Sequence, residues 1–305
     1  MAAWTADDIP DQKGRVALVT GANSGLGYCT ARELALHGAK VLLACRSPER
    51  GAEAVRRLRA QTPGVDVEYR PLDLADLAST RALAAELDTD QLDLLVNNAG
   101  VGGVPFGRTA DGFETHLGIN HLGHFALTGL LLPRLLATPG SRVVSVSSVM
   151  HFAARCTSND LRRRPRPYQR WLAYGRSKTA NLLFTRELAR RLSAADATTT
   201  AVAAHPGYAN TNLPRNAVGP GGPDFIDRLL VLGNRFVAQP PETGALPILY
   251  AATHPAIRQA AYIGPASLAP AHPVSARRAC WTRDDRQAAA LWEASEHLTG
   301  VKAPI

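Results

Sequence analysis

Length, composition and charge set the first limits on this 305-residue chain. Hydrophobic residues make up 46% of it and charged residues 20%, which excludes a disordered protein and fits one with a buried core. We expect a single α/β domain over residues 15–305, behind an N-terminal extension at 1–14. The net charge of +8 favours an anionic cofactor or substrate, and without a nucleic-acid motif it predicts no nucleic-acid partner.

The N-terminus and the apolar runs carry no export or membrane signal. Residues 1–14 contain three aspartates and lack the basic start and apolar stretch of a signal peptide. The apolar run Leu127–Leu136 is interrupted by Pro133 and Arg134, so it falls short of a membrane span. We therefore expect a soluble, cytoplasmic protein.

Short apolar runs alternate along the chain with segments of helical periodicity. Helical faces follow Gly25 and Ser177. Such alternation predicts right-handed crossovers and a doubly wound parallel sheet covered by helices on both faces. The predicted strands are Arg15–Thr20, Lys40–Ala44, Val65–Tyr69, Leu92–Val96, Arg142–Val146 and Thr199–Ala203.

A glycine-rich turn follows the first predicted strand. Glycines let a backbone approach a pyrophosphate, and the following helix N-terminus offers N–H donors and a favourable dipole. Three glycines can also simply form a tight turn, but their position between strand and helix predicts a dinucleotide site. Its residues are Gly21, Asn23, Ser24, Gly25, Leu26 and Gly27.

The end of the second strand distinguishes between the two nicotinamide dinucleotides. An NAD site places a carboxylate there for the ribose 2′-hydroxyl, whereas this strand runs into Cys45-Arg46-Ser47 with no acid before Glu49. A guanidinium matches phosphate oxygens, so Arg46, with Ser47 beside it, favours NADPH and NADP+. The alternative is that Arg46 is an ordinary surface side chain.

Two separated segments supply groups for proton transfer. Tyr174 and Lys178 are four residues apart on a predicted helix and therefore share one face. A phenol is a poor acid near neutrality unless a cation lowers its pKa, and Lys178 is expected to do so. Ser148, after the fifth strand, would hydrogen-bond a substrate oxygen, and Ser147 is the alternative serine.

Beyond Pro206 the alternation weakens. The glycine- and proline-rich stretch Gly219–Pro223 precedes an apolar segment, Phe225–Val231. Ligands bind beyond the carboxyl ends of parallel strands, so we expect residues from about 208 to about 243 to form a C-terminal substrate lid.

Taken together, these motifs resemble the short-chain dehydrogenase/reductase family from about Arg15 to Thr211. The resemblance rests on Thr20–Gly27, Asn97–Gly100, Asn120, Ser148 and the Tyr174/Lys178 pair. Cys45-Arg46, Asn120–Phe125, His205–Gly207 and the long spacing from Ser148 to Tyr174 are similar to the branch of retinol dehydrogenases and protochlorophyllide reductases. This implies a Rossmann-type fold and hydride transfer between NADPH or NADP+ and a carbonyl or alcohol carbon.

The resemblance also implies individual roles. Asn120 would join Ser148, Tyr174 and Lys178 as a catalytic residue by holding a water that links Lys178 to solvent. The remaining positions would line the cofactor: Asp73 and Leu74 at the adenine, Asn97, Ala99 and Gly100 at the ribose and nicotinamide, and Pro206, Gly207 and Thr211 at the carboxamide and phosphates. Tyr174 and Lys178 would contact the cofactor too.

Other polar groups are expected to be structural. The cysteines at positions 29, 45, 156 and 280 match neither a Cys-x-x-Cys pair nor a metal-ligand set, and we expect free thiols and no bound metal. The histidines at 121, 124, 151 and 205 are expected to pack or cap rather than catalyse, because the Tyr174/Lys178 pair already supplies a proton.

Substrate and alternative functions stay open at this stage. The pocket wall should come from Val149–Trp171 and Tyr208–Val237, whose apolar content favours a hydrophobic ketone, aldehyde or alcohol. Arginines within Arg155–Arg170 leave room for an acidic or carrier-linked substrate. A non-redox isomerase, dehydratase or cyclase on the same fold, and a cofactor-binding regulator, are the alternative functions. The oligomeric state is undecided.

Overall fold

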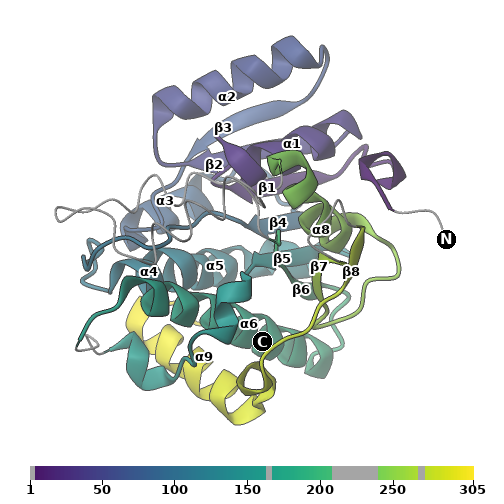
Figure 1. Cartoon of the computed structure of the whole chain (residues 1–305). Helices are drawn as coiled ribbons and strands as arrows, with labels where there is room; N and C mark the ends of the chain where they lie inside the picture. Colours follow the sequence, from purple (N-terminus) through teal and green to yellow (C-terminus); the bar gives the residue numbers. More distant parts are fainter. Residues whose placement is uncertain (1–3, 163–166, 208–239, 267–271) are drawn as a thin grey trace.

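The sheet is the frame on which every candidate site residue is placed. The computed structural model describes residues 4–162, 167–207, 240–266 and 272–305, and in them eight strands lie in the order β3-β2-β1-β4-β5-β6-β7-β8. Figure 1 shows this sheet running through the molecule with helices on both sides. The strands are β1 Val16–Thr20, β2 Lys40–Cys45, β3 Val67–Pro71, β4 Leu94–Asn97, β5 Arg142–Val146, β6 Thr200–Ala204, β7 Tyr262–Pro265 and β8 Pro273–Ser275.

The first seven strands are parallel and the eighth is not. The six strands predicted from sequence are confirmed, with ends that differ by up to two residues. β7 and β8 were not predicted. β8 pairs antiparallel with β7, so the predicted doubly wound parallel sheet is confirmed and gains one antiparallel strand at this edge. Both strands are short and contain proline, which suits an edge and hides the strand signal.

One face of the sheet is covered by α1 (Gly25–Leu36), α2 (Pro48–Gln61) and α8 (Pro241–Thr253). The opposite face is covered by α3 (Leu77–Glu86), α5 (Gly123–Ala137) and α6 (Arg170–Ala194). Successive strand residues enter the two cores alternately, as the twofold repeat of a strand requires. This double burial explains why the strands consist of nearly continuous apolar runs.

The last helix, α9 (Asp285–Thr299), lies along α6 at the outside of the second layer (Figure 1). Its Trp292 stacks on Phe184 of α6 with ring centroids 5.8 Å apart and meets the edge of Phe125 of α5 at 5.0 Å. The C-terminal segment is therefore part of the core, in agreement with a single domain.

Short helical turns join these elements on the side where the strands end. They include α4 (Thr115–Leu117), the π-helical turn η2 (Gly118–Leu122), and the 3-10 turns η3 (Val149–Phe152) and η4 (Ser158–Leu161). The chain also contains two further 3-10 turns, η1 (Ala6–Asp8) near its start and η5 (Cys280–Arg283) just before α9. η2 contains Asn120 and leads directly into α5, and η3 begins directly after Ser148.

Several features bear on the other expectations. Most of the predicted lid, residues 208–239, lies outside the described residues, and its last residues belong to α8. None of the helices in the described ranges is both long and apolar enough to cross a membrane. All four cysteines are free, with Cys280 exposed and the other three buried.

Candidate functional site

The candidate site lies where β1, β4, β5 and β6 end. β1 pairs with both β2 and β4, so the chain reverses its direction of winding beside β1. A reversal of this kind leaves a crevice beyond the carboxyl ends of the strands, which is the usual ligand site of an open α/β sheet. The predicted glycine turn, Asn97–Gly100 and Ser148 all follow strands that end at this edge.

Gly21, Gly25 and Gly27 have different structural roles in the turn. Gly21 has φ +67° and packs so closely that a Cβ would lie 3.0 Å from Cα of Ala99. A Cβ on Gly27 would lie 2.5 Å from the carbonyl oxygen of Gly21, so only glycine fits there. Gly25 has φ +55° and open space around it, which leaves its backbone accessible.

The N-terminus of α1 is available to an anion. Ser24 is the N-cap residue, and its side chain makes no capping hydrogen bond. The N–H groups of the first helical turn therefore lack a side-chain acceptor and point beyond the helix end. Together with the open space at Gly25, this matches what a pyrophosphate requires.

Thr20 connects the glycine turn to the segment after β4. Its hydroxyl oxygen accepts hydrogen bonds from the backbone N–H groups of Asn98 and Ala99, both at 2.9 Å. The Asn98 side chain donates to the Thr20 carbonyl at 2.7 Å. Asn98 is thus structural, as expected, and the two loops that would enclose a nicotinamide are fixed to each other.

Arg46 and Ser47 lie at the start of α2, beside the glycine turn. Arg46 is exposed, and within the described parts of the chain it has no hydrogen-bond or ion-pair partner. Ser47 caps α2 by accepting from N–H of Arg50 at 3.2 Å and donates to Glu49 at 2.8 Å. The Arg46 guanidinium is therefore available to a phosphate. The Ser47 hydroxyl could donate to a phosphate only by giving up its hydrogen bond to Glu49.

The residues expected at the adenine and ribose differ in accessibility. Asp73 forms a turn in which its carboxylate accepts from N–H of Ala75 at 2.9 Å, and Leu74 is buried. The Asn97 side chain is also buried and donates to Thr128 of α5 at 2.9 Å. Contact of Asn97 with a cofactor would therefore have to come from its backbone, next to Ala99 and Gly100.

Tyr174 and Lys178 lie on α6, as predicted, with Ser148 opposite them. Tyr174 is 6% exposed and Lys178 is 4% exposed. Nζ of Lys178 lies 5.6 Å from the centre of the Tyr174 ring and donates to the Val146 carbonyl at 3.0 Å. The spacing of four residues thus brings the phenol and the ammonium together at the end of β5.

The acidity of Tyr174 differs from the expectation. Burial raises the pKa of Tyr174 to about 12, and hydrogen bonding with Ser148 opposes this increase only in part. Burial also lowers the pKa of Lys178 to about 8. The ammonium is engaged by the Val146 carbonyl, so in this state Lys178 does not make the phenol more acidic than usual.

The two serines after β5 are clearly distinguished. Ser147 is 2% exposed, and its hydroxyl donates to the backbone carbonyl of Lys178 at 2.9 Å. Ser148 is half-buried, caps η3 by accepting from N–H of Met150 at 3.2 Å, and hydrogen-bonds Tyr174. Ser147 thus supports the helix that carries the lysine, and Ser148 faces the phenol.

Asn120 lies in the π-helical turn, and its side chain makes three hydrogen bonds. Its amide exchanges two hydrogen bonds with the backbone of Val101, at 2.8 and 2.9 Å, and donates to Ser177 at 2.9 Å. A water that links Lys178 to solvent would need the second lone pair of Oδ1 or of the Asn120 backbone carbonyl, which accepts from His124 at 3.1 Å. Its expected role as a water-holding residue remains a prediction.

Gly100 shows how closely the two halves of the site meet. A Cβ on Gly100 would lie 3.0 Å from Oδ1 of Asn120 and 3.6 Å from Nζ of Lys178. Ala99, its neighbour, is hydrogen-bonded to Thr20 at the glycine turn. Lys178 and the glycine turn are thus separated by a single loop.

The last part of the site is described incompletely. Gly207 has φ +72°, follows Pro206 and donates its N–H to Nδ1 of His205 at 3.2 Å. Thr211 and Tyr208, which were expected to flank the cofactor and the substrate, lie outside the described residues.

The four histidines at this edge are all hydrogen-bonded and buried. His124 contacts the Thr20 hydroxyl at 2.9 Å, and His121 contacts Ser295 of α9 at 2.9 Å. His151 contacts the Ser148 carbonyl at 2.7 Å. Burial lowers the pKa of His121 to about 3 and those of His124 and His205 to about 4, so these rings are neutral at pH 7.

Sequence reasoning did not single out the buried polar residues around Tyr174. Glu114, His116 and Tyr168 form one hydrogen-bonded group next to the phenol. Tyr262 of β7 is 2% exposed beside Ser147. The spacing of Glu114 and His116 gave no recognisable motif, and Tyr262 lies on a strand that was not predicted.

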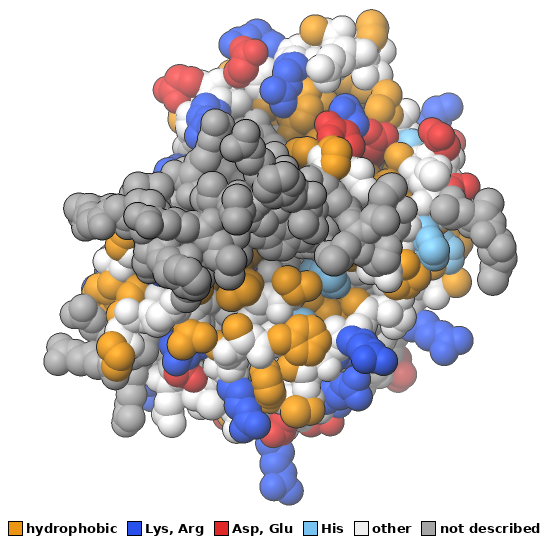
Figure 2. Space-filling model, viewed as in Figure 1, with side chains coloured by type: hydrophobic (Ala, Val, Ile, Leu, Met, Phe, Trp, Pro, Cys, Tyr) orange, Lys and Arg blue, Asp and Glu red, His pale blue; other side chains and the backbone are white. Residues whose placement is uncertain are grey.

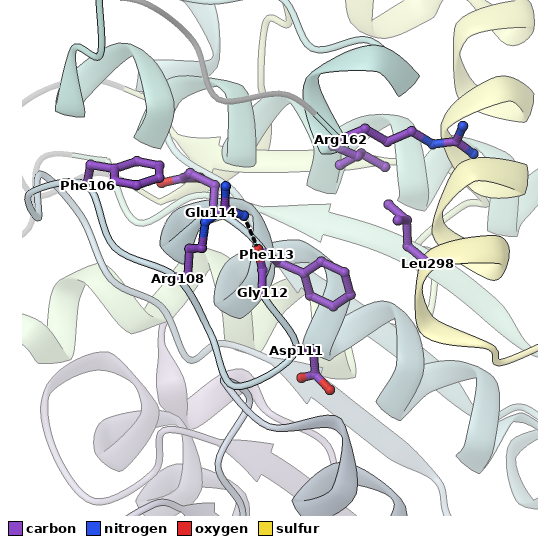
Figure 3. Close-up of a pocket in the computed structure, with 9 residues that line it drawn as sticks. Phe106, Arg108, Asp111, Gly112, Phe113, Glu114, Arg162 and Leu298 are labelled. Atoms are coloured by element: carbon purple, nitrogen blue, oxygen red, sulfur yellow. Dashed lines mark hydrogen bonds between the residues drawn. The ribbon is translucent and has the colours of Figure 1, made fainter.

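A pocket of about 230 Å³ is lined mainly by residues outside the predicted pocket wall (Figure 3). Among the described residues of the expected wall, only Leu161 and Arg162 contribute, and Ser148, Tyr174 and Lys178 do not line it. Its other lining residues are Phe106, Arg108, Asp111, Gly112, Phe113, Glu114 and Leu298. This pocket is therefore distinct from the candidate site around Ser148, Tyr174 and Lys178.

Comparison with known proteins is consistent with this geometry. The family model described as short chain dehydrogenase matches residues 15–218. Human retinol dehydrogenase 12 is 50% identical over 206 residues, which are 67% of this chain and 64% of that protein. Human retinol dehydrogenase 13 is 39% identical over 296 residues, 95% of this chain and 86% of that protein. The crystal structure of an uncharacterized protein from Mycobacterium paratuberculosis is 43% identical, covers 100% of both chains and has a TM-score of 0.82.

Proposed function

Because the chain belongs to the short-chain dehydrogenase family, we propose that it is an NADPH-dependent oxidoreductase acting on an apolar carbonyl or alcohol. The observation that carries the proposal is the short connection between the two halves of the site. Ser148, Tyr174 and Lys178 meet at the end of β5, and only the Ala99–Gly100 loop separates Lys178 from the glycine turn. The family and the similarity to retinol dehydrogenases, both predicted from the motifs, are confirmed.

The residues present fit a nicotinamide dinucleotide. Gly25 leaves open space in front of the uncapped N-terminus of α1, where a pyrophosphate would bind. Gly21 and Gly27 hold the turn in this shape because any larger residue would meet backbone atoms. When bound, the reduced cofactor supplies the hydride that a carbonyl carbon accepts.

The protein supplies the proton and the electrostatic support. As the carbonyl oxygen becomes an alkoxide, Tyr174 would donate its phenolic proton to that oxygen, and Ser148 would hydrogen-bond the same atom. Lys178 lies 5.6 Å from the phenol ring, where its positive charge would stabilise the phenolate left behind. In alcohol oxidation the same groups would act in reverse.

The Tyr174 phenol is protonated at neutral pH, as a group that donates a proton to a carbonyl oxygen must be. Burial raises its pKa to about 12, which makes it a weaker acid than a free phenol. Release of the proton therefore requires charge to develop on the substrate oxygen beside Lys178.

Apolar side chains around the phenol support an apolar substrate. Trp171 and Met150 pack with Tyr174 in one small cluster. Val149, Phe152 and Leu172 are exposed by 41%, 48% and 38% and lie on η3 and the first turn of α6. Exposed large hydrophobic residues gathered at one place mark a binding surface. Figure 2 shows hydrophobic and basic side chains mixed on the face below the grey residues.

The first test is a panel of aromatic and long-chain aldehydes and ketones with NADPH. We expect one NADPH to be consumed for each alcohol formed, measured by absorbance and product analysis. An isomerase, dehydratase or cyclase would leave NADPH unchanged, and a regulator without turnover would form no product. Binding of NADPH without consumption across the whole panel would therefore contradict an oxidoreductase.

The second test concerns the extra phosphate of NADPH. Replacing Arg46 with Ala should lower kcat/KM for NADPH by about 10- to 100-fold, because one charge-assisted contact is lost, and should change the NADH value little. Arg56→Ala is the matched control, since Arg56 is also exposed on α2 but pairs with Glu53. Equal efficiency of the unmodified protein with NADPH and NADH would refute the preference.

A further inference from the structure

A buried carboxylate and imidazole lie directly behind the candidate acid. Oε1 of Glu114 and Nδ1 of His116 are 2.9 Å apart, with the two side chains 6% and 0% exposed. The His116 ring faces the Tyr174 ring at a centroid distance of 6.2 Å and a tilt of 57°. Neither residue is used by the proton transfer proposed above, yet both are costly to bury without a role or full pairing.

Glu114 has its hydrogen-bonding capacity filled. Oε1 also accepts from the Tyr168 hydroxyl at 2.8 Å and from N–H of His116 at 3.0 Å, and Oε2 accepts from N–H of Leu117 at 2.9 Å. Burial alone would raise the pKa of Glu114, but these hydrogen bonds outweigh it and lower the pKa. The carboxylate is therefore a charged, immobile anchor.

His116 transmits this anchoring to the loop over the site. Its Nε2 accepts from N–H of Val104 at 3.3 Å, so with Nδ1 facing the carboxylate the hydrogen bonds assign the neutral ring with its proton on Nδ1. Val104 belongs to the loop that begins at Gly100, beside Lys178. The same histidine thus contacts the phenol ring and fixes the loop between the phenol and the glycine turn.

Trp171 also contacts the Tyr174 ring, and it packs against the same loop. Trp171 meets the Tyr174 ring edge-on, with centroids 6.2 Å apart and an interplanar angle of 83°. A Cβ on Gly103 would lie 2.6 Å from the Trp171 ring, so the loop is in close contact with the indole. The Tyr174 ring is held between His116 and Trp171, and both are tied to residues 103 and 104.

The pocket of Figure 3 lies on the outer side of this group. Glu114 contributes to its wall, and in Figure 3 its side chain points away from Leu298 and Arg162, toward Phe106. Phe106 in turn meets Tyr168 edge-on with ring centroids 5.3 Å apart. Glu114 therefore lines this pocket and at the same time hydrogen-bonds His116, which packs against the Tyr174 ring.

We propose that Glu114 and His116 are positioning residues, which hold the Tyr174 ring and the Val101–Val104 loop in the orientation required for proton transfer. This inference rests on the proposed function, because it assigns a purpose to the geometry around Tyr174. Neither side chain touches a substrate: His116 acts through the phenol ring and Val104, and Glu114 acts through His116. Loss of either should leave a folded protein that binds NADPH normally but transfers hydride slowly.

The test compares His116→Phe and Glu114→Gln with the unmodified protein and with Tyr174→Phe. We expect both variants to bind NADPH with a Kd within about twofold of the original, and to lose about 10- to 100-fold in kcat with little change in KM for the aldehyde, as a misplaced reacting group implies. A ligand-free crystal structure of His116→Phe should show a displaced Tyr174 ring. Glu187→Gln is the matched control, because Glu187 is a buried carboxylate on α6 held by Arg190 and Arg191, away from the phenol.

The outcomes separate the two proposals. If Tyr174→Phe keeps the original activity, the proposed function fails. If Tyr174→Phe is inactive while folded His116→Phe and Glu114→Gln keep kcat within about twofold, the positioning role fails and the function stands. Should both variants be unfolded, Tyr168→Phe decides, since it removes one hydrogen bond to Glu114 and keeps the ring. A several-fold lower kcat at unchanged NADPH Kd supports the inference, and an unchanged kcat overturns it.

Discussion

The proposed cofactor half and the proposed catalytic half of this site are built in different ways. The glycine turn, Ser24, Arg46 and the start of α1 lie within 26 residues of one another, and their function depends mainly on backbone shape and free N–H groups. The proposed catalytic half joins residues that are distant in sequence, such as Asn120 with Ser177 and Ser147 with Lys178. Its function depends on buried side chains whose properties are set by their surroundings. We therefore expect that one substitution can abolish turnover without weakening NADPH binding, and that another can weaken NADPH binding without disturbing the residues around Tyr174.

The largest expected effect is a loss of turnover at unchanged NADPH affinity, and it comes from Tyr174→Phe. Tyr174→Phe deletes only the hydroxyl, so the proton donor is lost while the ring still packs between His116 and Trp171. We expect kcat to fall by about 10²- to 10⁴-fold, the usual contribution of a general acid, with NADPH affinity unchanged. Steady-state assays and fluorescence titration would measure the two quantities. A parallel loss of NADPH binding would show that the halves are not independent.

Gly27→Ala should have the opposite effect, weaker NADPH binding with the residues around Tyr174 left in place. The new Cβ would lie 2.5 Å from the Gly21 carbonyl, so the turn must shift, at a cost of about 1–3 kcal/mol in the free energy of unfolding. NADPH affinity should fall at least tenfold, whereas the hydrogen bonding of Ser148 with Tyr174 stays in place. Gly140→Ala is the control, because Gly140 has φ +71° but open space and lies before β5, away from the cleft. It should lose stability without losing affinity.

A smaller effect concerns acid stability, which should arise mainly in the catalytic half. Burial lowers the pKa of His121 to about 3 and of His124 and His205 to about 4, below the value of about 6.5 in an unfolded chain. Their folded-state pKa values are depressed, so their contribution to stability is complete above pH 6.5. It should decline by about 1.4 kcal/mol per pH unit for each ring as the pH falls toward 4.

Urea unfolding at pH 7, 6 and 5 would measure this slope. His121→Gln should make the slope smaller, since one of the buried rings with a depressed pKa no longer titrates. His297→Gln is the control, because His297 is exposed near the end of α9, and it should leave the slope as it was. A free energy of unfolding that does not change between pH 7 and 5 would contradict the assignment of neutral, buried rings.

The sequence predicted much of the fold because local patterns decide it. Six strands, the alternation with helices and the glycine turn follow from apolar runs and glycine positions that any fold with this sequence must accommodate. It missed β7 and β8 because short strands containing proline have no clear pattern. The distinction between Ser147 and Ser148 also needed the structure, because these adjacent residues follow β5 in extended chain, where neighbouring side chains point to opposite sides, and the sequence does not tell which side faces the site.

By itself, the sequence determined six of the strands, the glycine turn between β1 and α1, and the position of Tyr174 and Lys178 on one helical face, since these depend on residues close together in the chain. Only the tertiary structure decided the protonation of that pair, the engagement of the Asn120 side chain and the placement of Glu114 and His116 behind the phenol. The physical reason is burial. A pKa or a hydrogen-bond partner depends on which distant segments exclude water from a group, and that is known only when the chain is folded.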